Sequence, residues 1–293
     1  MIKKTDRNFL YFALLIIAIE AVMFAVGDWK INQGIMLEEY RLEKAQTVLA
    51  AVPVEAKAFS VYDITAKKKL YGKNDEEPLP LASLAKIMTI IAVLNTHGPD
   101  DIVTMSDNAL KQNGDYGFKP GEVWKVGDLA KATLIVSAND GAQALAESVP
   151  DFLDKITKKA RKIGATHATF LNASGLDLDP SHASVFASAE DVNQMAAFAY
   201  DDYPGIFGTT VLPEIHVTSV SGFEHVFKNT DVILDKIPNL LFSKTGFTNV
   251  AGGNLTIIFK NQSGHEMAVT LLGSGFDSRF ADMQKLVDAI DSL

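Results

Sequence analysis

The sequence contains no cysteine among its 293 residues. This absence excludes a disulfide framework, catalysis by a thiolate and anchoring through a lipid-modified cysteine. Stability must therefore come from an apolar core. The chain is long enough to bury one, because 47% of its residues are hydrophobic and only 22% are charged.

Concentrated positive charge is also missing. Asp and Glu number 36 against 27 for Lys and Arg, which leaves a net charge of -9. Since phosphate binding needs a basic face, this balance argues against nucleic acid as the main partner. The six histidines lack the paired spacing of a zinc site. We predict neither a metal nor a cofactor.

The first thirty residues carry the information about location. Residues 1–8 contain three cations, Lys3, Lys4 and Arg7, and an apolar run follows at residues 9–26. As a helix this run reaches about 27 Å, close to the thickness of a bilayer core. The cations predict that the tail 1–8 stays in the cytoplasm and that the chain after Gly27 is exported. Because the end of the run also resembles a cleavage site, secretion after cleavage near Gly27 is the alternative.

The rest of the chain reads as a spacer and one folded domain. Residues 27–52 mix apolar and charged side chains, which predicts a helical spacer, and the domain then covers residues 53–293. Strands are expected at 58–63, 69–71, 215–226 (a hairpin), 255–259 and 267–272. Helices are expected at 128–136, 141–148, 152–163 and 282–290. This order predicts an α+β fold, with one antiparallel sheet assembled from both ends of the domain around a helical insertion.

Ser83 and Lys86 are the strongest candidates for chemistry. Apolar residues continue with helical spacing from Leu84 to Leu94, so we expect Ser83 in the first turn of a helix. Residues three apart share a helix face, which makes the serine and the lysine neighbours. Lys86 could then take the serine's proton if burial or a nearby cation suppressed its charge. A serine three residues before a lysine is also common by chance.

Two further motifs strengthen this interpretation. Ser137-Ala138-Asn139 follows an apolar run, and Lys244-Thr245-Gly246 precedes strand-like sequence. The order of the three motifs is that of penicillin-binding proteins and class A β-lactamases. More broadly, residues 56–286 resemble the D-alanyl-D-alanine carboxypeptidases among the low-molecular-mass penicillin-binding proteins. The matching segments are residues 82–89, 120–122, 137–142, 169–176, 244–248 and 251–252.

The resemblance implies a penicillin-binding-protein/β-lactamase-like transpeptidase fold with the active site between a sheet and a helical region. It implies a serine-type carboxypeptidase that trims peptidoglycan stem peptides ending in D-Ala-D-Ala and binds β-lactams covalently. Ser83 would attack the peptide carbonyl with Lys86 as the base. Ser137 would pass a proton to the leaving amine, although its position also suits a helix N-cap. Asn139 would bind either the substrate backbone or Lys86.

The remaining implied roles concern substrate binding. Lys244 and Thr245 would lie on a strand edge that pairs with the substrate, and Gly246 would permit close approach. The backbone N–H groups of Ser83 and Phe247 would form the oxyanion hole. A carboxypeptidase must hold a terminal carboxylate, for which Lys244, Thr245 and Arg279 are the candidates. An arginine at the start of the last helix can equally be structural.

Departures from the family pattern leave the nucleophile and base untouched. Family members often have asparagine where Asp231 stands and threonine where Ala85 stands, and many carry a C-terminal amphipathic anchor. We expect the N-terminal helix to serve as the anchor here, a single pass in a bacterial cell membrane with the catalytic domain outside. The alternatives are a β-lactamase, although the class A glutamate is missing before Leu171-Asn172, and a catalytically weak peptidoglycan-binding or penicillin-sensing membrane protein.

Overall fold

The computed structural model describes residues 23, 24, 26, 29, 33 and 36–293. It divides into one unit of residues 1–47 with Leu293 and another of residues 48–292. Within the described residues, 36–50 are helical. The predicted tail 1–8 and all but three residues of the predicted membrane run lie outside the described residues. In the part that is described, no helix has the length and apolar character needed to cross a membrane.

A five-stranded antiparallel sheet organises the larger unit, with strand order β10–β11–β12–β1–β2. Its strands are β1 (Ala58–Asp63), β2 (Lys68–Lys73), β10 (Leu240–Thr248), β11 (Gly252–Lys260) and β12 (Glu266–Ser274). The two ends of the domain meet where β1 pairs with β12, which places Ala58 opposite Leu272. The predicted assembly of one sheet from both ends of the domain is confirmed, and β10 is left at an edge.

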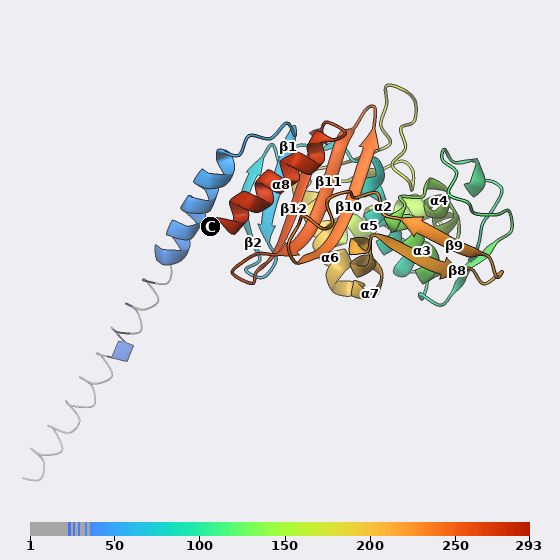
Figure 1. Cartoon of the computed structure of the whole chain (residues 1–293), viewed down its shortest axis with the longest axis horizontal. Coiled ribbons are helices and arrows are strands. Elements are labelled where there is room, and N and C mark those ends of the chain that lie inside the picture. Colours follow the sequence, from blue (N-terminus) through green and yellow to red (C-terminus); the bar gives the residue numbers. More distant parts are fainter. Residues whose placement is uncertain (1–22, 25, 27–28, 30–32, 34–35) are drawn as a thin grey trace, which may run out of the picture. The chain divides into compact units, whose positions relative to one another are not determined.

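Helices cover the two faces of this sheet (Figure 1). Helix α8 (Ser278–Asp291) packs on one face and α6 (Ala189–Asp202) on the other. Along β11, Leu255 and Ile257 belong to the apolar cluster that includes α8, whereas Ile258 belongs to the cluster that includes α6. Successive strand residues point to opposite faces, so this alternation gives the sheet a core on each side.

The helical insertion lies beside the β10 edge (Figure 1). Its helices are η1 (Ala82–Leu84), α2 (Ala85–Leu94), η2 (Ala109–Lys111), α3 (Val126–Ile135), α4 (Asn139–Glu147), α5 (Phe152–Lys162), α7 (Pro204–Phe207) and η3 (Gly208–Val211). Short strands pair as β3 (Leu79–Pro80), β7 (Val185–Ala187) and β6 (Thr169–Phe170), as β4 (Ile102–Thr104) with β5 (Val123–Lys125), and as β8 (Glu214–Thr218) with β9 (Glu224–Lys228). The expected hairpin around Gly222 is therefore present.

The start of the serine-bearing helix differs from the expectation. Ser83 lies in the 3₁₀ turn η1, and the α-helix begins only at Ala85. Leu81 still donates its N–H to the Val185 carbonyl at 3.0 Å, so the chain must turn sharply out of β3. Ala82 makes this turn with φ of +47°. Such a conformation costs about 1 kcal/mol for alanine, and the packing around the site must offset that cost.

Candidate active site

The buried side chain of Lys86 is the centre of the candidate site. Its Nζ lies 2.8 Å from Ser83 Oγ, 2.8 Å from Asn139 Oδ1 and 2.8 Å from the carbonyl oxygen of Ser174. A neutral amine can donate to the Asn139 and Ser174 oxygens and keep its lone pair for the Ser83 hydroxyl proton. The predicted Ser83–Lys86 contact is therefore present, with two acceptors that orient the amine.

The electrostatic surroundings of Lys86 favour its neutral form. Burial is the main cause that lowers its pKa well below the ordinary value, and the positive charge of Lys244 lowers the pKa further. Asp140, next to Asn139 at the start of α4, acts in the opposite direction. A lysine that gives up its proton in this way can accept one from a hydroxyl.

Ser137 joins this group through its contact with Lys244. It adopts φ of +63° immediately before α4, and its Oγ accepts a hydrogen bond from Lys244 Nζ at 3.0 Å. The N-cap residue of α4 is Ala138, with no side-chain cap. The alternative interpretation of Ser137 as an N-cap is therefore wrong, because the left-handed turn directs its hydroxyl to Lys244.

Asn139 is fully engaged within the protein. Its carbonyl oxygen accepts from Lys86, and its Nδ2 donates to the Asn113 carbonyl at 2.7 Å and to the Tyr116 hydroxyl at 3.4 Å. Of the two roles expected for Asn139, the structure displays the contact with Lys86. Asn113 and Tyr116 anchor the amide from a loop more than twenty residues earlier in the chain.

Strand β10 presents the third motif at the sheet edge. Lys244 is almost completely buried, and its Nζ also donates to the Thr245 carbonyl at 2.9 Å. Gly246 packs against the serine-bearing turn, because a Cβ at this position would lie 2.9 Å from the Leu81 oxygen and 3.2 Å from the Ser83 nitrogen. Only glycine lets the edge strand approach the serine this closely. The adjacent Phe247 side chain is 41% exposed.

Arg279 reaches the same strand from α8. One of its terminal nitrogens donates to the Gly246 carbonyl at 3.3 Å, and its guanidinium lies 4.5 Å from the centre of the Phe276 ring and 4.6 Å from that of Phe280. Within the described part of the chain its Nε has no hydrogen-bond partner. The structure thus brings Arg279 to the site, and it also gives the arginine structural contacts.

Lys244 and Arg279 form a buried pair of like charges. Burial is the main cause that lowers the pKa of Lys244 to about 7, the charge of Arg279 adds to this lowering, and Asp231 opposes it. Two desolvated cations in one place favour the binding of an anion. A carboxylate is the anion that this arrangement suits best, since arginine can hold both of its oxygens.

Sequence reasoning missed the supporting residues of the site. The Ser174 carbonyl is a partner of Lys86, and Asn113 and Tyr116 hold Asn139. Ser174 lies in the matching segment 169–176, but that match assigned it no role. Asn113 and Tyr116 have no local pattern that marks them, because their contacts with Asn139 join segments more than 20 residues apart. Asp231 was visible only as a departure from the family pattern. Its buried position close to β10 is visible only in the structure.

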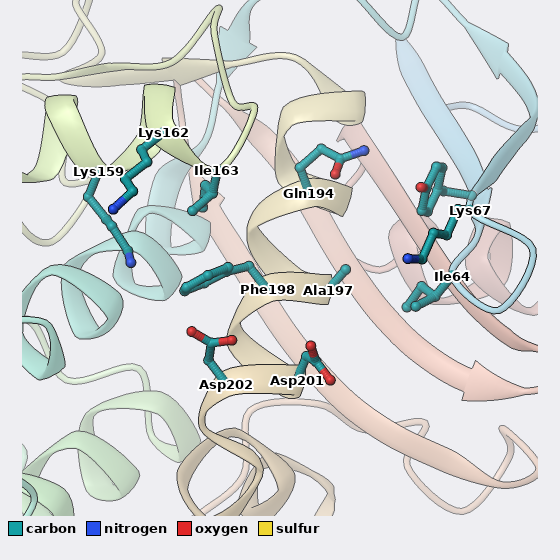
Figure 2. Close-up of a pocket in the computed structure, with 11 residues that line it drawn as sticks. Ile64, Lys67, Lys159, Lys162, Ile163, Gln194, Ala197, Phe198, Asp201 and Asp202 are labelled. Carbon is teal, nitrogen blue, oxygen red and sulfur yellow. The ribbon is translucent and has the colours of Figure 1, made fainter.

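A cavity of about 650 Å³ lies elsewhere, between the β1–β2 turn, the end of α5 and the outer surface of α6 (Figure 2). Lys159 and Lys162 line one side and Asp201 and Asp202 another, with the Phe198 ring between them. The Lys159 ammonium lies 4.3 Å from the centre of that ring. None of the nine predicted site residues lines this cavity.

The geometry defines a class of site. A serine hydroxyl hydrogen-bonded to an amine with lowered pKa, a second hydroxyl held by a buried lysine, and an open strand edge are the parts needed for acyl transfer to serine. The family of D-alanyl-D-alanine carboxypeptidases matches residues 44–274. Because this match covers most of the sequence, the chain belongs to that family.

Curated relatives are consistent with this assignment. The chain is 28% identical to the D-alanyl-D-alanine carboxypeptidase DacF of Bacillus subtilis, with 80% of this chain and 61% of the relative covered. It is 29% identical to DacC of Escherichia coli, with 83% and 63% covered. A D-alanyl-D-alanine endopeptidase of Pseudomonas aeruginosa is 28% identical, with 77% and 74% covered. The chain thus spans about three fifths of the length of the first two relatives.

Solved structures show the same fold. Penicillin-binding protein D2 of Listeria monocytogenes, in its ampicillin-bound form, superposes with a TM-score of 0.69 at 30% identity, covering 80% of this chain and 97% of that chain. A D-alanyl-D-alanine carboxypeptidase of Mycobacterium tuberculosis superposes with a TM-score of 0.75 at 23% identity, covering 82% and 92%. The α+β fold class with its antiparallel sheet is therefore confirmed.

The close packing of Gly246 on the serine turn generates a prediction. In Gly246→Ala the new Cβ must push β10 away from Leu81 and Ser83, so we expect covalent labelling by a fluorescent penicillin to slow by about 10- to 100-fold. The matched control is Gly205→Ala, where an added Cβ meets nothing within 4 Å. Equal labelling rates in the two variants would show that the approach of β10 is not critical.

Proposed function

We propose that this protein is a serine-type D-Ala-D-Ala carboxypeptidase that trims peptidoglycan stem peptides and is acylated by β-lactams. The observation that carries the proposal is the position of the Lys86 amine, buried and 2.8 Å from the Ser83 hydroxyl. Membership of the carboxypeptidase family supports the substrate class. The proposal assigns the chemistry to the chain's own side chains and needs no cofactor.

In the proposed acylation, Ser83 Oγ forms a bond to the carbonyl carbon between the two D-alanines, and its proton passes to Lys86 Nζ. The C–N bond then breaks, and the leaving amine receives a proton through Ser137, whose hydroxyl is held by Lys244. Water later hydrolyses the ester and releases the shortened peptide. Division into two steps avoids direct attack of water on a stable amide.

Charge that develops on the carbonyl oxygen needs fixed donors. We assign these to the backbone N–H groups of Ser83 and Phe247, which belong to the 3₁₀ turn η1 and to β10. The contact of Gly246 with the serine turn supports this assignment, because it keeps the two segments at a fixed separation. The substrate backbone would then extend along the free edge of β10.

The buried charges beside β10 support carboxypeptidase action rather than endopeptidase action. Lys244 and Arg279 are both buried, and Thr245 offers a hydroxyl beside them. A substrate carboxylate would neutralise the two cations and accept their hydrogen bonds. An internal peptide bond has no such charge to offer. We therefore favour substrates with a free C-terminus, although the family relatives include enzymes of both names.

We also propose that the protein is held in a bacterial cell membrane by residues 9–26, with the catalytic domain on the extracytoplasmic side. The apolar run and the three preceding cations support this location. A peptidoglycan substrate is found on that side of the membrane, so the location and the proposed substrate agree.

Mass spectrometry tests the function directly. We expect a pentapeptide ending in D-Ala-D-Ala to lose one alanine, and penicillin to add its full mass to the wild-type protein at Ser83. Ser83→Ala should lose both reactions, with cleavage reduced by more than about 1000-fold, because the attacking atom is gone. Adduct formation on Ser83→Ala would assign the nucleophile elsewhere, and rapid release of the adduct from wild type would indicate a β-lactamase.

Carboxylate recognition predicts a specific pH dependence. Lys244 carries its proton below a pKa of about 7, so kcat/KM for a free-acid peptide should fall as pH rises through that value. The C-terminal amide of the same peptide should show a much weaker decline. Arg279→Met should slow the free-acid peptide by about 10- to 100-fold more than the amide. Lys285→Met, on the exposed side of α8, is the control, and equal losses on both peptides in Arg279→Met would refute carboxylate recognition.

Membrane attachment is tested by fractionation. Fluorescent penicillin should label a full-length species that stays in the membrane fraction after a high-salt wash, because an apolar helix is not released by screening charge. A chain that begins after residue 27 should be labelled equally well but remain soluble. Recovery of the natural label in a soluble product beginning near Asp28 would contradict the anchor.

A further inference from the structure

Asp231 is a buried acidic residue next to the site that has no role in the steps above. It is 5% exposed and lies between β9 and β10. Ser243 donates its hydroxyl proton to Oδ2 at 2.5 Å, and the Ile233 N–H donates to Oδ1 at 2.9 Å. Both oxygens of the side chain therefore act as acceptors, which suits an ionised carboxylate. Burial raises the pKa of Asp231 above its ordinary value, whereas these two hydrogen bonds and the charges of Arg279 and Lys244 act in the opposite direction.

The segment around Asp231 holds β10 on both sides of Lys244. Asp231 binds Ser243, and Thr230 Oγ1 lies 2.6 Å from Thr245 Oγ1. The Thr230 N–H also donates to the carbonyl of Ile135 at 3.2 Å, at the end of α3 and two residues before Ser137. One short segment thus connects the strand that carries Lys244 with the helix that leads to Ser137.

Charge is the second part of the argument. Lys244 and Arg279 are buried cations, and neither has an ion pair within 4.0 Å in the described part of the chain. The charged groups that act on Lys244 are Arg279 from α8 and Asp231, and Lys86 from α2 is affected by Lys244 in turn. Asp231 is the one anion among the groups that act on Lys244, and it acts on Arg279 as well, where Asp277 at the start of α8 adds to its effect. Asp140 acts on Lys86. Asp231 therefore opposes the mutual repulsion of Lys244 and Arg279 before substrate arrives.

We propose that Asp231 is a positioning residue for the carboxylate subsite: it fixes β10 through Ser243 and supplies the negative charge that keeps Lys244 cationic beside Arg279. This inference rests on the proposed acyl-transfer function. The expected effect of Asp231 on Lys244 follows from the electrostatics, since burial and Arg279 lower the pKa of Lys244 while Asp231 raises it. The Asp231 carboxylate would thus set the upper pH limit of the reaction in this protein.

Asp231→Asn tests the charge separately from the shape. Asparagine has the same size and can still accept from the Ile233 N–H, but it carries no charge. The measurement is the rate of acylation by a fluorescent penicillin, which bears a carboxylate, between pH 5 and 9. In the wild-type protein the acylation rate should fall as pH rises through about 7, and we call this fall the alkaline decline. In Asp231→Asn we expect the alkaline decline to occur about one pH unit lower, so that acylation above pH 7 is roughly tenfold slower than in wild type. At the acidic end the two proteins should differ much less.

Ser243→Ala is the matched control. It removes the hydrogen bond and keeps the carboxylate, so its alkaline decline should stay at the wild-type pH. If the alkaline decline of Asp231→Asn stays at the wild-type pH, the inference is overturned. Equal shifts in Asp231→Asn and Ser243→Ala would also overturn it, because they would assign the effect to the hydrogen bond. If thermal melting shows that Asp231→Asn is unfolded, Asp231→Glu takes its place. That variant retains the charge, and a downward shift of a full unit in it would contradict the proposal.

The failure of this inference differs from the failure of the proposed function. If penicillin acylates the wild-type protein but the alkaline decline of Asp231→Asn is the same as in wild type, only the role of Asp231 is overturned. Wild-type protein that the penicillin does not acylate overturns the proposed function and the inference with it.

Discussion

The burial of the Lys86 amine beneath Ser83 is the constraint on which the rest of the site depends. In water the amine would stay protonated at neutral pH and could not accept the serine proton. Desolvation changes this, but a buried amine must have every hydrogen bond satisfied. Asn139, at the start of α4, and the Ser174 carbonyl meet that need.

The same burial opposes stability. In the unfolded chain a lysine binds its proton below a pKa of about 10.4, whereas the folded-state pKa values of Lys86 and Lys244 are lowered. As pH falls below that unfolded value, the unfolded state gains protons that the folded state does not, so the free energy of unfolding decreases. For Lys244 this decrease continues until pH reaches about 7. The apolar clusters on both faces of the sheet must offset it.

The fold places these charges by combining distant segments. Strand β10 brings Lys244 to a sheet edge, α2 carries Lys86, and the first turn of α8 delivers Arg279 to the carbonyl of Gly246. The sheet itself closes only when β1 from the start of the domain pairs with β12 near its end. The proposed carboxylate subsite therefore depends on contacts across most of the chain, although the proposed nucleophile and base are three residues apart.

The fold class, the helical insertion and the pairing of Ser83 with Lys86 could be predicted from the amino-acid sequence, because hydrophobic periods and the i,i+3 spacing are local properties. The motif order also indicated that Ser137 and Lys244 belong together. Three features could be seen only in the folded chain: Ser137 receives a hydrogen bond from Lys244 instead of capping α4, Ser174 supplies a carbonyl to Lys86, and Asp231 is buried against β10. These contacts join residues 12 to 107 positions apart, and the burial that sets the pKa values of the lysines exists only once those segments have packed.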